Sequence, residues 1–371
     1  MVLLVIFLGL FLLSIIYPRS KHITIAIVLF MLFVYAFTWH EGDLEVYEWV
    51  YRDLFTGRFY TAYEPGFVAL MWLCKKVGLS FTGFRFVLGS FITIIIYHIV
   101  RRQTDYSAFA MVLYCLFPFF VFSSVLRSGI SCVFVLLALE QLIIDKGNKK
   151  KYVIYILIGT LFHYSTVLFL PFLLFTGKIK KTRLIGAFVG MCVLSFLINY
   201  TNVMYSIVST FTQRQKIVGW LMKNDATANI NGIIAIGVLL IAVYLLNRNN
   251  VKKLPEKIGG GYSVSGIRNN QIQISYQMSV YMLFLSPLMV LASPIMRVPY
   301  MVFLIFIIST VNIVSGNREE HIGRHPGTIV ITISWVALVL TVFLWKFYAD
   351  LPYIKNGAHL FGEFIDSQFM W

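Results

Sequence analysis

Several charged side chains interrupt otherwise apolar stretches of this sequence, and their types suit acid–base and phosphate chemistry. An ionisable side chain is costly at membrane depth, so each one found there is a candidate functional group. A carboxylate or an imidazole can transfer a proton, and a guanidinium group binds a phosphate or pyrophosphate through paired hydrogen bonds. Together they would suit chemistry on a phosphorylated lipid carrier. The candidates are Asp43, Glu64, Arg127, His163 and Arg297.

The composition places these residues in a membrane protein. The 371 residues are 59% hydrophobic and 13% charged, with a mean hydropathy of +0.79, whereas soluble domains carry roughly 45–50% apolar and about 25% charged residues. This excludes a soluble enzyme, a disordered chain and a nucleic-acid-binding module. The net charge of +15 is explained first by orientation in the membrane. The four cysteines show no metal-ligand spacing, so we expect no metal.

The apolar segments predict an all-α polytopic integral membrane protein with a single membrane domain over residues 1–371. A full span needs about 20 residues to cross a hydrocarbon core of about 30 Å. The first segment lacks the basic flank and cleavage site of a signal peptide, so we interpret it as a span. The ten predicted full spans are 1–17, 22–39, 82–100, 106–123, 125–144, 184–200, 231–246, 276–292, 295–314 and 329–347.

Two further apolar stretches do not fit a simple crossing. Residues 66–74 are too short and are predicted to form a helix that dips into the membrane. Residues 152–175 are flanked by basic clusters on both sides, and a single crossing would place one cluster on the wrong face. We therefore predict a re-entrant helix pair that turns near His163 and Tyr164. Such a turn is tolerated only where protein or a wet cavity surrounds it.

The basic residues then assign the two faces. Most of the 31 lysine and arginine residues fall in loops on one side, which is the cytoplasmic side by the positive-inside rule, so both termini are predicted outside. The candidate groups consequently converge on the outer half of the membrane. The predicted loops and tail are the acidic outer loop 40–65, the outer loop 201–230, the basic cytoplasmic loop 247–275 and the outer C-terminal tail 349–371.

Four of the five candidates, all except Glu64, also have a purely structural explanation. Asp43 is suited to cap the helix that follows it, and His163 could simply bind a backbone carbonyl. Arg127 and Arg297 could bind carbonyls that hold the bundle together. Their convergence on one face favours a functional site. The residues expected on a solvated helix face are Glu45, Glu48, Arg52 and Asp53, and those expected to extend their charge toward the interface are Arg85 and Lys346.

A series of short motifs in a fixed order resembles a known family. The order is GDxxxYxxxY from Gly42, then YEPGF at 63–67, LRSGIS at 126–131, LFHYS at 161–165, and a late span that begins with an arginine. This order is similar to that of EpsG-like and Wzy-type bacterial polysaccharide polymerases, and the resemblance runs over most of the chain.

The resemblance implies a glycosyltransferase at the outer face of the bacterial cytoplasmic membrane. It would join undecaprenyl-pyrophosphate-linked oligosaccharide units into an O-antigen, capsule or exopolysaccharide chain. The lipid pyrophosphate is already an activated leaving group, so no nucleotide and no cofactor is expected. The expected partners are the lipid-linked oligosaccharide, the bilayer, a chain-length regulator and a flippase, with no nucleic acid.

The resemblance also implies roles for the candidate residues. Arg127 and Arg297 would bind the pyrophosphate, His163 or Asp43 would be the base, and Glu64 would shape the sugar site. The tyrosines expected to stack on or hydrogen-bond to sugars are Tyr47, Tyr51 and Tyr63.

Other functions for a membrane protein of this kind predict other features. A lipid-linked oligosaccharide flippase would need two pseudo-repeat halves and a cationic cavity at mid-depth, and the sequence shows no repeat. An O-antigen ligase uses the same donor but is expected to carry a long outer loop between late spans. The polymerase is therefore the preferred hypothesis, followed by the flippase and then the ligase.

The re-entrant hypothesis makes a labelling prediction. Single cysteines replacing Lys151 and Lys178 should both face the cytoplasm, because a helix pair that turns back leaves both ends on the same side. A membrane-impermeant thiol reagent added to intact cells should label neither, and both should react after permeabilisation. Labelling of either position from outside contradicts this topology.

Overall fold

The computed structural model describes residues 2–37, 43–56, 63–144, 147–176, 264–289 and 297–319, together with isolated helical positions between 186 and 251. Within these ranges every regular element is a helix, in agreement with the predicted class. The predicted spans 184–200, 231–246 and 329–347, the outer loop 201–230 and the tail 349–371 lie wholly or mostly outside the described residues.

The first half of the chain contains the long helices expected from its hydropathy. Each helical segment begins and ends within three residues of its predicted span when α6, η2 and α7 are taken together as one segment, 107–124. The helical segments over residues 81–103, 107–124 and 126–143 are long and apolar enough to cross a membrane. The elements are α1 (Val2–Ile16), α2 (Lys21–Phe37), α5 (Phe81–Gln103), α6 (Ser107–Tyr114), the π-helical turn η2 (Cys115–Phe119), α7 (Phe120–Ser124) and α8 (Leu126–Ile143).

The late helices are α14 (Val264–Met289), the 3₁₀ turn η5 (Pro299–Val302) and α15 (Phe303–Glu319). Helix α14 begins inside the segment 247–275 that was predicted to be a loop, so the last part of that segment is helical. Its amide side chains lower the hydropathy, yet they bind neighbouring helices rather than water. Asn270 Nδ2 donates to Ile143 O at 3.0 Å, and Gln271 Oε1 accepts from Asn312 Nδ2 at 2.7 Å.

Short helices form where simple crossings were not expected. Residues 66–74 belong to α4 (Pro65–Lys76), and residues 152–175 form α9 (Lys149–Thr160) and the 3₁₀ helix η3 (Tyr164–Phe175). The chain reverses at 161–163, where the sequence predicts the turn. Tyr152 Oη donates to Phe169 O at 2.7 Å, so the two helices pack antiparallel. Helix α9 is about 18 Å long, well short of the bilayer core, and the return of the pair to the cytoplasmic face stays a prediction.

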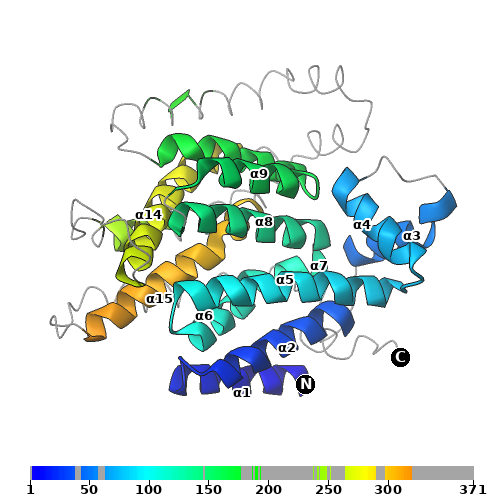
Figure 1. Ribbon diagram of the computed structural model, residues 1–371, viewed down its shortest axis with the longest axis horizontal. Coiled ribbons are helices and arrows are strands. Elements are labelled where there is room, and N and C mark those ends of the chain that lie inside the picture. The colour runs from blue at the N-terminus through cyan, green and yellow to red at the C-terminus, as the bar shows by residue number, and fades with distance from the viewer. Residues whose placement is uncertain are drawn as a thin grey trace.

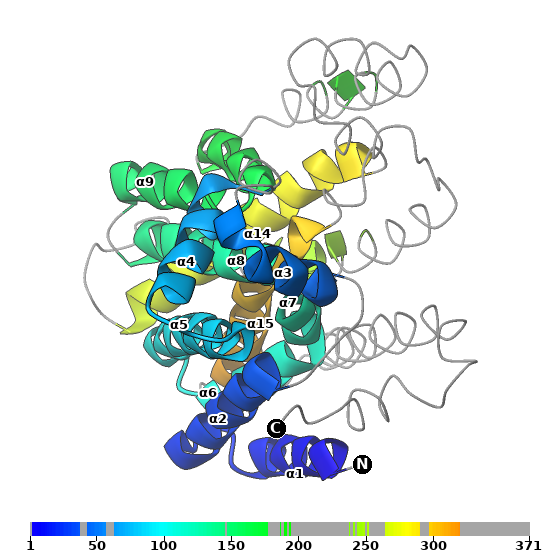
Figure 2. The same cartoon turned by 90° about the vertical axis from the view of Figure 1, so that its right-hand side faces the viewer.

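The helices form a bundle with one end covered by two short helices. Helices α2, α5, α8 and α9 lie in succession beside one another, and α14 and α15 cross this row (Figure 1). Helices α3 (Asp43–Arg52) and α4 lie at the end where α8 begins (Figure 1). Figure 2 shows them lying across that end of the bundle. The described part of the segment 40–65 contains helix α3, which the spacing of its charged residues predicts, and the 3₁₀ turn η1 (Leu54–Thr56).

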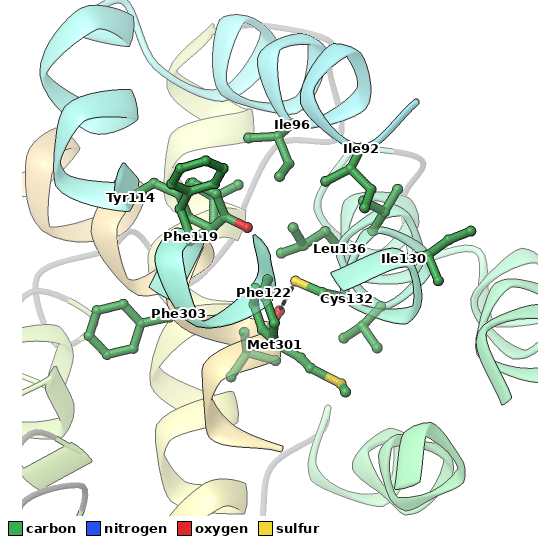
Figure 3. Close-up of a cluster of buried hydrophobic side chains, with 14 of the residues drawn as sticks. Ile92, Ile96, Tyr114, Phe119, Phe122, Ile130, Cys132, Leu136, Met301 and Phe303 are labelled. Carbon is green, nitrogen blue, oxygen red and sulfur yellow. Dashed lines mark hydrogen bonds between the residues drawn. The ribbon is translucent and has the colours of Figure 1, made fainter. Parts of the chain in front are cut away.

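The centre of the bundle is a dry core that fixes α8 against the start of α15. Residues from α5, α6, α7 and α8 meet those of η5 and α15 there (Figure 3). Cys132 Sγ donates a hydrogen bond to Met301 O at 3.4 Å across this contact. Phe117 packs edge-on against Phe303, with ring centroids 4.8 Å apart. Because interiors are close-packed, these contacts determine how far along the bundle Arg127 and Arg297 lie relative to one another.

Helices α2 and α5 approach one another unusually closely at a glycine. A Cβ added at Gly89 would lie 2.5 Å from Tyr35 Cβ, which is far inside van der Waals contact. Tyr35 is fully buried, so neither backbone can move aside without disturbing the core. A small residue at this crossing is therefore required, as is usual where membrane helices pack closely.

This contact makes a stability prediction. Gly89→Ala should destabilise the protein by about 1–3 kcal/mol, the range observed when a packed core is overfilled, and should lower the apparent melting temperature in detergent. Gly9→Ala on α1 is the matched control, because a Cβ at Gly9 meets nothing within 4 Å. An unchanged melting temperature for Gly89→Ala would contradict this packing of α2 on α5.

Candidate functional site

The start of α4 places Glu64 inside the end of the bundle. Pro65 opens the helix at a position where its fixed φ is favourable and its missing N–H is not needed. The next residue, Gly66, donates its N–H to Leu161 O at 2.8 Å, and a Cβ there would lie 2.8 Å from the same oxygen. Glycine is therefore needed for α4 to dock on the turn between α9 and η3. This docking brings Glu64, which is 2% exposed, next to His163.

The Glu64 carboxylate joins three separate parts of the fold. Its Oε2 accepts a hydrogen bond from Arg127 NH1 of α8 at 2.6 Å. Its Oε1 lies 3.2 Å from His163 Nδ1 and also accepts the backbone N–H of Tyr164 at 3.3 Å. Both carboxylate oxygens are thus occupied, as a buried charge requires.

These contacts determine the charge state of Glu64, which lies in the segment just before α4. Burial alone would raise its pKa, but the hydrogen bond from His163 and the charge of Arg127 outweigh burial and lower the pKa from 4.5 to about 2. The interaction therefore stabilises the fold fully above about pH 4.5 and is lost as the pH falls through about 2. At neutral pH Glu64 is a fixed anion and hydrogen-bond acceptor rather than a proton carrier.

His163 is oriented by Glu64. It precedes η3 in an extended backbone conformation and is buried. An ionised carboxylate only accepts hydrogen bonds, so the Nδ1 atom carries the proton that is donated to Glu64. The other ring nitrogen, Nε2, is buried and has no hydrogen-bond partner among the residues that the structure describes. This arrangement leaves the Nε2 lone pair available to accept a proton.

Arg127 is enclosed by aromatic rings and acids. Its Nε donates to Tyr47 Oη of α3 at 3.1 Å, in addition to the bond from NH1 to Glu64. The guanidinium carbon lies 4.6 Å from the ring centroid of Tyr63 and 5.7 Å from that of Tyr47. These cation–π contacts leave the Arg127 side chain only 13% exposed.

A second arginine–carboxylate pair lies beside the first. Arg297 NH1, just before η5, is 3.5 Å from Asp43 Oδ2 at the start of α3. The two side chains are 31% and 44% exposed. The charge of Arg297 also acts on His163 and Tyr47, so this pair belongs to the same site. Residues far apart in the sequence therefore meet at one end of the bundle.

The structure brings together all the predicted site residues except Tyr51. The Tyr51 hydroxyl donates to Leu79 O at 2.8 Å, and its ring stacks on Phe84 of α5 with centroids 5.5 Å apart. Tyr51 thus attaches α3 to α5, away from the arginines.

Arg85 of α5 was expected to extend toward the interface but is buried instead, where it interacts with Glu48. The Tyr164 N–H on Glu64 is a backbone contact that no motif indicates.

Glu45 and Arg52 of α3 are exposed and fit the solvated-face explanation, whereas the Glu48 side chain is only 15% exposed and does not. Arg52 NH2 lies 2.5 Å from Glu48 Oε1, one turn earlier on the helix, and the Arg52 side chain is exposed. Among the residues that the structure describes, no group of three or more histidine, cysteine, aspartate or glutamate side chains could hold a metal ion. The site contains one imidazole, two carboxylates, two guanidinium groups and tyrosine rings.

Comparison with known proteins identifies the chain by family. The model of the EpsG family matches residues 21–355, which is most of the sequence and includes every residue of the site. No curated protein and no solved structure matches the chain. This match confirms the resemblance carried by the motifs, and the chain belongs to the EpsG family, which points to a membrane protein of the polysaccharide polymerase type.

Proposed function

We propose that this protein is a polysaccharide polymerase that joins oligosaccharide units carried on undecaprenyl pyrophosphate at the outer face of the bacterial cytoplasmic membrane. One observation carries the proposal. An oriented imidazole, whose Nε2 has no hydrogen-bond partner among the described residues, lies in the same site as two arginines and two tyrosines, at one end of a membrane bundle. Proton removal, pyrophosphate stabilisation and sugar binding need these three kinds of group.

The reaction uses an activated leaving group that the substrate already carries. A hydroxyl of the acceptor sugar attacks the anomeric carbon of the donor, a glycosidic bond forms, and the bond from that carbon to the pyrophosphate oxygen breaks. The electron pair of that bond leaves with undecaprenyl pyrophosphate, and the hydroxyl proton passes to His163 Nε2. The protein contributes by holding the two sugars in line and by accepting this proton.

His163 is a better base than Asp43 in this geometry. Asp43 is 44% exposed and faces Arg297, whereas His163 is buried and its Nδ1 is held by Glu64. The fixed negative charge of Glu64 stabilises the imidazolium ion that forms when Nε2 accepts the proton. Glu64 therefore supports the base instead of exchanging a proton itself.

The arginines and tyrosines act on different parts of the substrate, the pyrophosphate and the sugars. Arg297 supplies positive charge where negative charge develops on the pyrophosphate, while Arg127, bound to the buried Glu64, contributes its charge without leaving that partner. The rings of Tyr47 and Tyr63, whose centroids are 5.5 Å apart, are buried against Arg127, so they support the sugar site from behind rather than stack on a sugar. A flippase that delivers the lipid-linked unit and a regulator of chain length are the partners that this activity requires.

The arginines provide one test. Arg127→Lys and Arg297→Lys should each reduce polymer formation by roughly ten- to a hundred-fold, because lysine is a point charge and cannot reproduce the planar, directed hydrogen bonds of a guanidinium group, which are worth about 1.5–3 kcal/mol. The measurement is the ladder of products from purified protein and lipid-linked repeat units. Arg52→Lys, an exposed arginine on α3, is the matched control and should give normal ladders. Normal ladders from both site variants contradict the proposal.

The base and its carboxylates provide another test. His163→Ala should abolish polymer formation, Glu64→Gln should reduce it strongly, and Asp43→Asn should lower the amount or length of polymer. The amide oxygen introduced by Glu64→Gln could still accept the Nδ1 hydrogen bond but would not stabilise the imidazolium ion. Glu45→Gln on the exposed face of α3 is the matched control for loss of one negative charge. If His163→Ala retains wild-type rates, another group removes the proton.

A further inference from the structure

The two arginines of the site differ in burial and in the strength of their bonds. On the basis of the function proposed above, we propose that the two arginines have different roles, one in binding the ligand and one in positioning other side chains. Arg297 binds the phosphate oxygens of the ligand in exchange for the carboxylate of Asp43, with the Ser128 hydroxyl as a second donor. Arg127 stays bound to Glu64 throughout and acts as a positioning residue for His163 and the tyrosines.

Arg127 is already committed to protein partners. Its Nε and NH1 donate to Tyr47 and Glu64, and the rings of Tyr47 and Tyr63 lie along it. Moving it toward a ligand would leave the Glu64 carboxylate, which is 2% exposed, without its cationic partner. Breaking a buried pair in this way is strongly unfavourable. Arg127 therefore cannot exchange Glu64 for a phosphate during each turnover.

Arg297 is held far more loosely. Its 3.5 Å separation from Asp43 exceeds the usual range of an N–H···O hydrogen bond, and the two side chains are 31% and 44% exposed. Exposed ion pairs of this kind contribute little to stability and are screened by salt. A diphosphate carries more negative charge than one carboxylate and offers oxygens for a two-pronged contact. It can therefore replace Asp43 on Arg297.

From the packing of the core we infer a second donor, Ser128, near Arg297. Cys132 of α8 bonds to Met301 of η5 (Figure 3). One helical turn earlier on α8 is Ser128, and four residues before Met301 is Arg297, at the same end of the bundle. The Ser128 hydroxyl is fully buried and has no hydrogen-bond partner within the described part of the chain. A phosphate oxygen bound to Arg297 would satisfy this hydroxyl.

Asp43 is then an internal competitor for the ligand rather than a base. Its carboxylate occupies Arg297 between turnovers and helps to displace the pyrophosphate product. Removing its charge should tighten binding of the anion while slowing product release. The proposal thus predicts that Asp43→Asn lowers both KM and kcat, whereas loss of a catalytic base would lower kcat alone.

The experiment measures binding of inorganic pyrophosphate to the purified full-length protein in detergent by isothermal titration calorimetry. Asp43→Asn should bind about two- to fivefold more tightly, since the exposed pair with Arg297 is worth about one kcal/mol or less. Arg297→Lys should bind about tenfold or more weakly, and Ser128→Ala several-fold more weakly. Arg127→Lys should bind within about twofold of wild type although its polymer formation is reduced roughly ten- to a hundred-fold.

The controls match each change in charge. Arg52→Lys and Glu45→Gln on α3 should leave pyrophosphate binding unchanged. Should Arg127→Lys fail to fold, the double variant Arg127→Gln with Glu64→Gln removes both buried charges together and should still bind pyrophosphate. Size-exclusion profiles establish that each variant is folded before titration.

The outcomes separate this inference from the proposed function. Equal weakening by Arg127→Lys and Arg297→Lys, or unchanged or weaker binding by Asp43→Asn, overturns the different roles of the two arginines. If the wild-type protein still produces ladders in that case, the polymerase assignment stands and only this inference fails. If the binding contrasts hold but no ladder forms from lipid-linked units, the anion site stands and the polymerase assignment fails.

Discussion

A buried carboxylate sets the main constraint on this site. Glu64 is 2% exposed yet ionised, and such a charge persists only when hydrogen bonds and an opposite charge replace the water it has lost. Arg127, His163 and the Tyr164 N–H provide these partners from two other parts of the fold. The start of α4, the start of α8 and the turn between α9 and η3 are consequently held together by one side chain.

The same constraint explains why irregular backbone is found at this end of the bundle. Between α9 and η3 the chain leaves the helical conformation at the extended residue His163, and non-helical backbone is tolerated at membrane depth only where protein or a water-filled cavity surrounds it. Helix α4 supplies that protein, and the Gly66 N–H binds Leu161 O in the turn itself. A conventional span across 152–175 would carry His163 in mid-helix, where Nδ1 could not reach Glu64 as it does from an extended residue.

Hydropathy was sufficient to predict the long helices and the turn near His163, because lipid demands apolar length and the basic flanks forbid a single crossing. It placed the start of α14 too late, since polar side chains such as Gln271 are bonded inside the bundle rather than solvated. Residue type and spacing likewise grouped Tyr47 with Tyr51, which are one turn apart on α3. Only the packing shows that Tyr47 reaches Arg127 whereas Tyr51 reaches Leu79. The different roles of Tyr47 and Tyr51 depend on tertiary contacts, which cannot be read from a single sequence.

The two arginine–carboxylate pairs have the same charges and the same chemical groups, but they differ in how deeply they are buried. Between Arg127 and Glu64 the atoms are 2.6 Å apart and shielded, so the pair is too costly to break and behaves as part of the framework. Between Arg297 and Asp43 they are 3.5 Å apart and accessible, so the pair can open with little loss. A site that must stay assembled while it binds and releases an anion needs one pair of each kind. If both were buried the ligand could not displace either carboxylate, and if both were exposed nothing would hold His163 in line with Glu64.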